Sequence, residues 1–277
     1  MQLGIDTYSY HLAFGAHPGF RPARPMDLFM FMDRASELGV HGFQIDPMHL
    51  ASHEHHYLAA VRDEARARSL FVEHGIMSVR SEAIAAGVEE CAVLGAQILR
   101  SFLGFDRYSA STNVRRELDQ AEEQIRQSLP ALKDAGVRLA IENHGDLTST
   151  ELAELVERID DPAVGICLDT GNPLAVFEDP RAAVERMVPF AVSTHFKDCA
   201  VIPTGGGFRV TGAPLGKGIL PLDDLFRLIE EQGEVSRILL ELPMEPVANE
   251  RESLEREDEA VRLSVAFLRE RLLPVSA

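Results

Sequence analysis

The stretch that decides the fold reads RLAIENHGDLTST at residues 138–150 and VGICLDTGN at residues 164–172. Each of these two segments contains a short apolar run that stops at a carboxylate, Glu142 in the first and Asp169 in the second. Two later apolar runs stop in the same way, at His195 and at Glu241. Because all strands of a parallel sheet run in one direction, their ends lie along one rim. The sequence therefore predicts a functional site at that rim.

Outward from this stretch, short apolar runs alternate with helix-length segments along the whole chain. The predicted strands are 3–8, 42–46, 70–74, 98–102, 139–142, 165–169, 191–195 and 237–242. The predicted helices are 27–38, 57–69, 79–94, 114–134, 151–158, 181–187, 223–232 and 253–272. Three of the helices are followed by Gly39, Gly95 or Gly136, as is typical of a helix C-terminus.

This alternation predicts an α/β protein with the (β/α)₈ (TIM) barrel fold, whose usual length agrees with the 277 residues of the chain. A doubly wound sheet is the competing fold, but no G-x-G-x-x-G follows the first predicted strand. No linker or low-complexity segment divides the chain. One domain over residues 1–277 is therefore the simpler prediction.

The composition narrows the classes of partner. The chain has 44 acidic and 27 basic residues, a formal net charge of −17, which disfavours binding to a phosphate backbone. No apolar run approaches the length of a membrane span, and the N-terminus begins directly with a strand-like run. Cys91, Cys167 and Cys199 are widely spaced, which favours reduced thiols and a cytoplasmic location. The sequence does not determine the oligomeric state, and it excludes neither a monomer nor a homo-oligomer.

The four strand-end residues form a set of metal ligands. Glu142, Asp169, His195 and Glu241 are separated by 27, 26 and 46 residues, each roughly one strand–helix unit or slightly more. Three carboxylates and one imidazole suit Mn²⁺, Mg²⁺ or Co²⁺ better than a structural zinc ion, which prefers thiolates. Any one of these acids alone has a simpler explanation, because strand-end carboxylates commonly cap the next helix. Together they favour a metal site.

Further polar residues fall on the same rim. His11, His49, His74, His144 and Lys197 follow or end predicted strands and are candidates for substrate binding. Each of the histidines has an alternative role as a hydrogen-bonded loop or core residue. Lys197 lies two residues beyond His195 and therefore points the same way along a strand. It is a candidate to neutralise a substrate carboxylate.

The segment VIPTGGGFRV at residues 201–210 reads as a β-hairpin arm after the seventh strand, since two apolar runs flank three glycines. Loops after barrel strands close over active sites, so Arg209 of this arm is a further candidate for substrate binding. Alternatively, the arm is a purely structural element at the edge of the barrel, or it contacts another subunit.

The motifs IENH, LDTGN, STHFKD, PLGKG and LLELP, in this order and spacing, resemble the xylose-isomerase-like barrel family of sugar isomerases and epimerases. The resemblance covers essentially the whole chain. It implies one divalent ion held by Glu142, Asp169, His195 and Glu241, and a carbohydrate substrate. It also implies that Glu142 and Glu241 face opposite sides of the sugar as base and acid, with the ion stabilising an ene-diolate.

One departure from the family concerns Asn172. Ketose 3-epimerases of the family have a histidine at this place, so Asn172 is predicted to contact the substrate without an imidazole. The family also contains lyases and decarboxylases of oxidised sugars, which share the ion. The leading hypothesis is therefore a metal-dependent isomerase or epimerase of a small sugar or keto-sugar. A decarboxylase or lyase acting on a 3-oxo sugar or sugar acid is the second, and a non-catalytic sugar-binding barrel the third.

Overall fold

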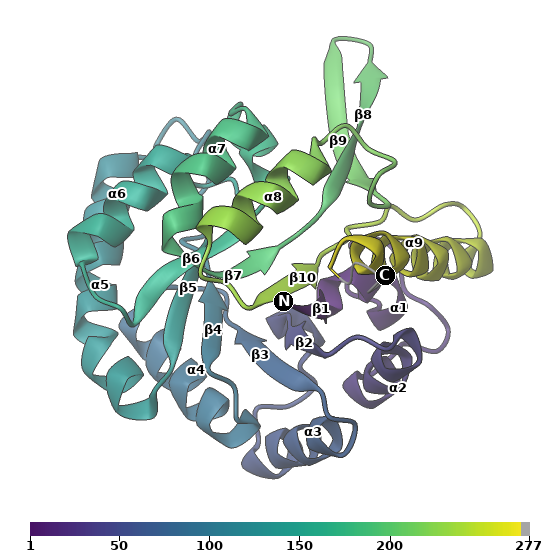
Figure 1. Ribbon diagram of the computed structural model, residues 1–277, viewed down its shortest axis with the longest axis horizontal. Helices are drawn as coiled ribbons and strands as arrows, with labels where there is room; N and C mark the ends of the chain where they lie inside the picture. Colours follow the sequence, from purple (N-terminus) through teal and green to yellow (C-terminus); the bar gives the residue numbers. More distant parts are fainter. Residues whose placement is uncertain (273–277) are drawn as a thin grey trace. The chain divides into compact units, whose positions relative to one another are not determined.

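The computed structural model describes residues 1–272, and its main feature is a sheet of eight parallel strands (Figure 1). The strands pair in the order β10-β1-β2-β3-β4-β5-β6-β7. Their bounds are β1 Gln2–Asp6, β2 Gly42–Ile45, β3 Phe71–Gly75, β4 Ile98–Ser101, β5 Arg138–Glu142, β6 Val164–Asp169, β7 Ala191–His195 and β10 Arg237–Leu240. A parallel bridge between Phe196, directly after β7, and Leu240 of β10 links the two ends of this order. The predicted (β/α)₈ barrel is thereby confirmed.

Helices follow the strands in the predicted alternation. Their bounds are α1 His11–Phe14, α2 Leu28–Leu38, α3 His55–Ala67, α4 Ser81–Leu94, α5 Val114–Ala135, α6 Ser149–Ile159, α7 Pro180–Met187, α8 Leu222–Gln232 and α9 Glu250–Leu272. Short 3₁₀ helices lie at Thr7–Tyr10, Pro47–His49, Asn172–Val176 and Val188–Phe190. Gly39, Gly95 and Gly136 end their helices with φ of 62°, 74° and 65°, a left-handed conformation that glycine adopts without strain.

The chain divides into two compact units. The first comprises residues 1–72 and 195–222 and the segment from residue 236 onward, and the second comprises residues 73–194 and 223–235. The single domain over residues 1–277 stays a prediction, and residues 273–277 lie outside the described part of the chain.

In the first unit, an aromatic ring lies against two glycines of neighbouring strands. A Cβ atom at Gly42 would lie 2.2 Å from the ring of Phe71, and one at Gly4 would lie 2.7 Å from it. The guanidinium of Arg237 packs 4.1 Å from the centroid of the same ring. Glycine is required at both positions because the ring occupies the space of a side chain.

In the second unit, the residues of β5 alternate between two buried environments. Leu139 and Ile141 are completely buried on one side of the strand. On the other side, Ala140 packs with Ile98 of β4 and Cys167 of β6. Because successive side chains of a strand point to opposite faces, Glu142 lies on the same side as Ala140. The strand therefore presents its terminal carboxylate on the face of that small cluster.

A β-hairpin follows the seventh strand, as predicted. β8 (Asp198–Thr204) and β9 (Gly207–Ala213) pair antiparallel, and Figure 1 shows them extending away from β10 and α9 of the same unit. The base of the hairpin is held by the buried Asp198, whose carboxylate accepts hydrogen bonds from four backbone N–H groups. The donors are Cys199, Gly216, Gly218 and Leu220, at 2.8 to 3.1 Å.

We expect Asp198→Asn to lower the free energy of unfolding by about 2–4 kcal/mol, because the amide nitrogen cannot accept from two of the four N–H groups. Urea denaturation followed by circular dichroism measures the change. Asp179→Asn is the matched control, since Asp179 is an exposed N-cap of α7 and asparagine caps helices equally well. Equal stability of the two variants would contradict the anchoring role of Asp198.

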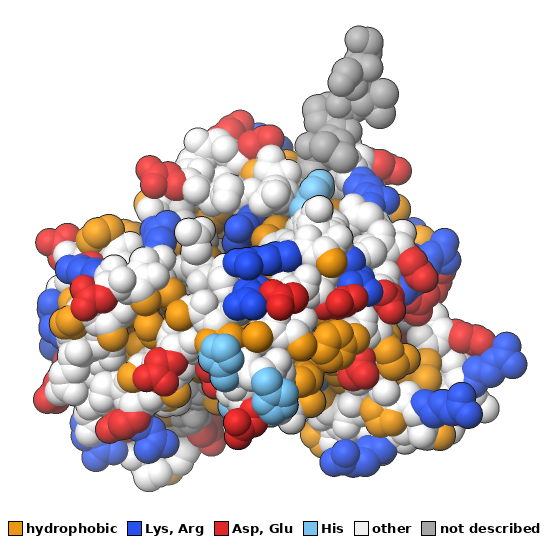
Figure 2. Space-filling model, turned by 90° about the horizontal axis from the view of Figure 1, so that it is seen from below, with side chains coloured by type: hydrophobic (Ala, Val, Ile, Leu, Met, Phe, Trp, Pro, Cys, Tyr) orange, Lys and Arg blue, Asp and Glu red, His pale blue; other side chains and the backbone are white. Residues whose placement is uncertain are grey.

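The surface carries charge of both signs. On the face drawn in Figure 2, acidic and basic side chains lie next to one another among apolar and neutral ones. Exposed ion pairs such as Arg251 with Glu255 and Arg181 with Glu185 contribute little stability each.

Among the described residues, no helix is long and apolar enough to span a membrane. Cys91, Cys167 and Cys199 are buried.

Candidate metal centre

The structure places all four predicted ligands at the ends of strands. Glu142 ends β5, Asp169 ends β6, His195 ends β7, and Glu241 directly follows β10. All four side chains are buried. Glu142 and Asp169 belong to the second unit, and His195 and Glu241 to the first.

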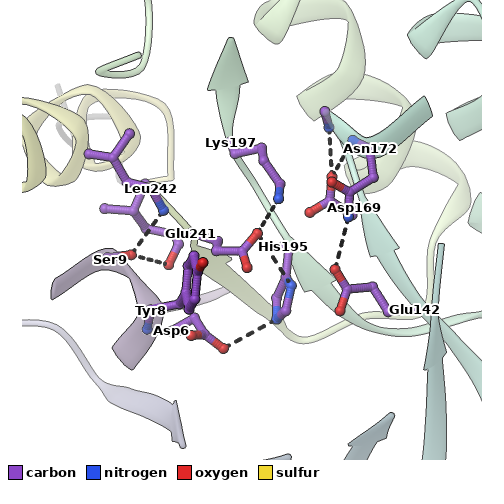
Figure 3. Close-up of polar contacts among 12 residues, drawn as sticks. Asp6, Tyr8, Ser9, Glu142, Asp169, Asn172, His195, Lys197, Glu241 and Leu242 are labelled. Atoms are coloured by element: carbon purple, nitrogen blue, oxygen red, sulfur yellow. Dashed lines mark hydrogen bonds and ion pairs between the residues drawn. The ribbon is translucent and has the colours of Figure 1, made fainter. Parts of the chain in front are cut away.

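In the second unit, Glu142 is held by two neighbours. The Nε of Arg100 on β4 donates to its Oε2 at 2.5 Å, and the amide nitrogen of Asn172 donates to its Oε1 at 3.0 Å (Figure 3 draws the contact with Asn172). Arg100 is itself only 3% exposed, and its Nη2 also pairs with Oε2. A buried guanidinium and an amide therefore fix the orientation of this carboxylate.

The carboxylate of Asp169 is fixed by the backbone that follows it. Its Oδ1 accepts from the N–H of Gly171 at 2.8 Å and from that of Asn172 at 2.6 Å. The side chain of Asn143 exchanges two hydrogen bonds with the backbone of Asp169, at 2.8 and 3.0 Å. The tight turn after β6 therefore determines where the second oxygen points.

In the first unit, the surroundings of His195 decide its tautomer. Its Nε2 lies 2.8 Å from the amide oxygen of Gln44 and 3.4 Å from Oδ2 of Asp6. Two acceptors at Nε2 place the proton there, so Nδ1 carries the lone pair. Nδ1 lies 3.7 Å from Oε2 of Glu241 (Figure 3). Two electron-rich atoms that face each other are stabilised by a cation bound to both.

Glu241 also forms an ion pair with the ammonium of Lys197, which is buried. The donor set of three carboxylates and one neutral imidazole fits a divalent metal ion. Buried carboxylates need compensating positive charge. Arg100 supplies one such charge in the second unit and Lys197 another in the first.

Two of the predicted substrate-binding histidines lie together in the first unit. The ring of Tyr8 stacks on His11 with centroids 4.7 Å apart and lies 6.2 Å from His49. The Nδ1 of His49 lies 2.9 Å from the hydroxyl of Thr7, and Phe14 stacks on the imidazole at 4.1 Å. Burial lowers the pKa of His11 to about 4 and that of His49 to about 3. Both imidazoles are therefore neutral at neutral pH.

The other three predicted substrate residues have different surroundings. His74 lies on the opposite face of β3 from Glu73, with its Nε2 2.6 Å from a carboxylate oxygen of Glu90 on α4. His144 stacks on Phe102 with centroids 4.2 Å apart. The side chain of Arg209 is 57% exposed, and its guanidinium lies 3.9 Å from Glu245. The substrate-binding roles of these three residues stay predictions. The side chain of His74 lies on the α4 side of β3, and this position does not favour contact with a substrate.

The sequence reasoning missed Arg100, Gln44 and Asp6. All three are polar residues inside or at the end of otherwise apolar strands, in LRS, FQI and GID. A polar residue within a buried strand is a signal that could have found them, because burial is costly unless the group has a partner. The partners themselves are 42 to 189 residues away in the chain, as for Arg100 with Glu142 and Asp6 with His195.

We expect His11 and His49 to contribute a loss of stability as the pH falls below about 6.5, the pKa of an unfolded histidine, against an opposite contribution from the single carboxyl group of Glu257, whose pKa burial raises to about 8. The unfolded chain takes up protons at His11 and His49 first, because burial lowers both pKa values in the fold. The loss continues through about pH 4 for His11 and pH 3 for His49. Each histidine contributes at most about 1.4 kcal/mol per pH unit.

Urea unfolding at pH 7 and pH 5 tests this expectation. His49→Gln should show a shallower loss between the two pH values than the wild type, because glutamine does not titrate. The exposed His55 provides the control, His55→Gln, which should keep the wild-type slope. A wild-type slope in His49→Gln would show that other groups dominate the pH dependence.

The matching family model describes the xylose isomerase-like TIM barrel and covers residues 32–271. The chain therefore belongs to this family. A curated relative, the 3-oxo-isoapionate decarboxylase of Pectobacterium atrosepticum, is 26% identical over 97% of this chain and 95% of its own.

Two solved structures share the fold. D-psicose 3-epimerase with D-tagatose from Clostridium cellulolyticum H10 has a TM-score of 0.77 at 13% identity and covers 98% of this chain and 99% of its own. The IOLI protein with a bound zinc atom has a TM-score of 0.72 at 15% identity, and the match covers 98% of this chain and 97% of the IOLI chain.

Proposed function

We propose that this protein is a metal-dependent decarboxylase of a 3-oxo sugar acid, and that Lys197 binds the carboxylate of the substrate. The observation that carries the proposal is the buried ammonium of Lys197, which pairs with Glu241 next to the His195 imidazole. A buried cation that lies beside the candidate ligands offers an acidic substrate a partner of opposite charge. The name of the Pectobacterium relative supports the same reaction class.

A 3-oxo acid loses carbon dioxide because its ketone accepts the electrons of the breaking bond. The C–C bond to the carboxylate breaks, the carboxylate leaves as CO₂, and the electron pair moves into the carbonyl to give an enolate. A proton then adds to the former α carbon and restores the ketone. The site must therefore hold a carboxylate, stabilise charge on the carbonyl oxygen and return one proton.

The residues present can meet these three requirements. Glu142, Asp169, His195 and Glu241 would hold the divalent ion, for which the oxygen-rich donor set favours Mn²⁺, with Mg²⁺ and Co²⁺ as alternatives. When bound, such an ion supplies Lewis-acid stabilisation of developing negative charge. Lys197 would exchange Glu241 for the substrate carboxylate. Tyr8 lies beside Glu241 (Figure 3). Burial is the largest cause that raises the pKa of the Tyr8 hydroxyl, and the charge of Glu241 is the second. The hydroxyl therefore stays protonated at neutral pH and carries a proton that it can donate.

Epimerisation or isomerisation of a small sugar or keto-sugar is the second candidate. The presence of two glutamates, Glu142 and Glu241, at separate strand ends favours it, since this chemistry needs a base and an acid. However, Arg100 pairs with Glu142 and Lys197 pairs with Glu241. A fixed cation stabilises the carboxylate anion, which favours metal binding over proton uptake. We therefore place decarboxylation first.

Incubation of the Mn²⁺-loaded protein with 3-oxo sugar acids and neutral keto-sugars in D₂O, followed by NMR, separates the candidates. The proposal expects CO₂ release from the acids and one deuterium in the ketone product. Deuterium exchange without carbon loss, on neutral keto-sugars, would instead support epimerisation. Binding without turnover of either substrate group would support a non-catalytic sugar-binding barrel. Protein treated with a chelator is the control, and full activity after exhaustive chelation would overturn the metal dependence.

A further inference from the structure

The last helix of the chain sends one acidic side chain into the interior of the first unit. Glu257 of α9 is completely buried. It contacts a segment that lies 245 residues earlier in the chain. Its two carboxylate oxygens accept hydrogen bonds from the backbone N–H groups of Leu12 at 2.8 Å and Ala13 at 2.9 Å. Both donors belong to the first turn of α1, whose N–H groups have no partner within the helix. Glu257 thus holds the helix that begins with His11.

The same carboxylate faces the imidazole of His11. Oε1 of Glu257 lies 3.7 Å from Nδ1 of His11, and the carbonyl oxygen of Tyr8 lies 3.0 Å from the same nitrogen. A backbone carbonyl can only accept, so the Tyr8 oxygen places the ring proton on Nδ1 and Nε2 carries the lone pair. Glu257 lies beyond hydrogen-bond distance of Nδ1 and makes only an electrostatic contact with the ring. Tyr8 stacks on the ring and fixes its plane, since the two rings are inclined by only 8°.

The burial of Glu257 has a cost that a merely surface-exposed acid would avoid. Burial raises its pKa to about 8, while the two backbone N–H groups oppose that rise. A leucine of similar volume would fill the same space without this penalty. The acidic group is therefore better explained by the N–H groups and the imidazole that it contacts than by packing alone.

We propose that Glu257 is a positioning residue for His11: it anchors the first turn of α1 and thereby fixes the position and orientation of an imidazole that contacts the substrate. The role of His11 at the substrate rests on the function proposed above. Glu257 itself lies behind α1 and acts only through His11. A less buried contact on the next residue of α9 provides the comparison: the side chain of Asp258 is 38% exposed, accepts from the Tyr10 hydroxyl at 2.9 Å and pairs with Arg34 at 2.7 Å.

A double-mutant cycle with His11→Ala tests the proposal. Glu257→Gln in the wild-type background should lower kcat/KM for the substrate about tenfold, within the usual range of coupled neighbours. In the His11→Ala background the same substitution should change kcat/KM less than about twofold. Asp258→Asn is the matched control and should lower kcat/KM by the same factor in both backgrounds. An equal loss from Glu257→Gln in both backgrounds would overturn the proposal.

A second measurement does not depend on turnover. Nitrogen-15 NMR of histidine-labelled protein without substrate reports which ring nitrogen of His11 carries the proton. We expect the His11 ring signals of Asp258→Asn to match those of the wild type, and those of Glu257→Gln to shift, because the loss of one backbone acceptor releases α1 and the imidazole from their fixed position. An unchanged His11 signal in a folded Glu257→Gln variant would refute the positioning role. Because this signal is read without substrate, it separates failure of the positioning role from failure of the proposed reaction.

Discussion

Glu142→Gln and Glu241→Gln are each expected to lower kcat by at least about 10³-fold and to reduce the bound metal well below one ion per chain. Each substitution removes the charge of a buried carboxylate from the proposed set of metal ligands. It also leaves a buried cation, Arg100 or Lys197, without its carboxylate partner. Loss of one partner of a buried pair costs several kcal/mol. Steady-state kinetics and elemental analysis of the purified variants measure both effects.

The control for these variants is Glu245→Gln, four residues beyond Glu241. Glu245 is half exposed and lies near Arg209 and His17, apart from the four candidate ligands. It should keep the metal content and at least half of the wild-type kcat. If Glu142→Gln or Glu241→Gln kept nearly normal rates with full metal content, the role of that carboxylate would have to be assigned elsewhere on the rim.

Much of the ligand set could be predicted from the sequence, and the reason is geometric. A parallel strand that ends on a carboxylate or an imidazole places it at the same rim as its neighbours, whatever the details of packing. The runs that end at Glu142, Asp169 and His195 therefore sufficed to indicate one site. The glycine stops and the GGG turn of the hairpin are equally local, since each depends on the backbone freedom of one or two residues.

The partners of these ligands could not be predicted in the same way. The contacts of Arg100 with Glu142 and of Gln44 with His195 join strands that are far apart in the sequence. Which side of a strand a residue faces also depends on register, and a shift of one residue reverses it. For this reason His74, which is predicted to end the third strand but is followed by Gly75 within β3, lies against Glu90 of α4.

The two buried cations give the candidate site a charge pattern that its ligands alone do not reveal. Arg100 is fixed between Glu142 and the ring of Phe102, whose centroid lies 5.0 Å from the guanidinium. Lys197 has a more flexible stem and a single ammonium, which can exchange one carboxylate for another at little geometric cost. Of the two, Lys197 is therefore the better candidate to bind a substrate carboxylate.

Lys197→Met is expected to lower kcat/KM for 3-oxo sugar acids by about 10²–10³-fold, the effect of removing one partner from a buried charge pair. Methionine keeps the apolar stem and the volume, so the metal ligands should remain in place and the metal content near one ion per chain. Turnover of a neutral keto-sugar, where it occurs, should fall far less, because it has no carboxylate to bind. Lys133→Met on the exposed side of α5 is the control and should leave both activities unchanged. Equal losses on acidic and neutral substrates would mean that Lys197 stabilises the candidate metal ligand Glu241 rather than binding the substrate. Epimerisation would then replace decarboxylation as the preferred function.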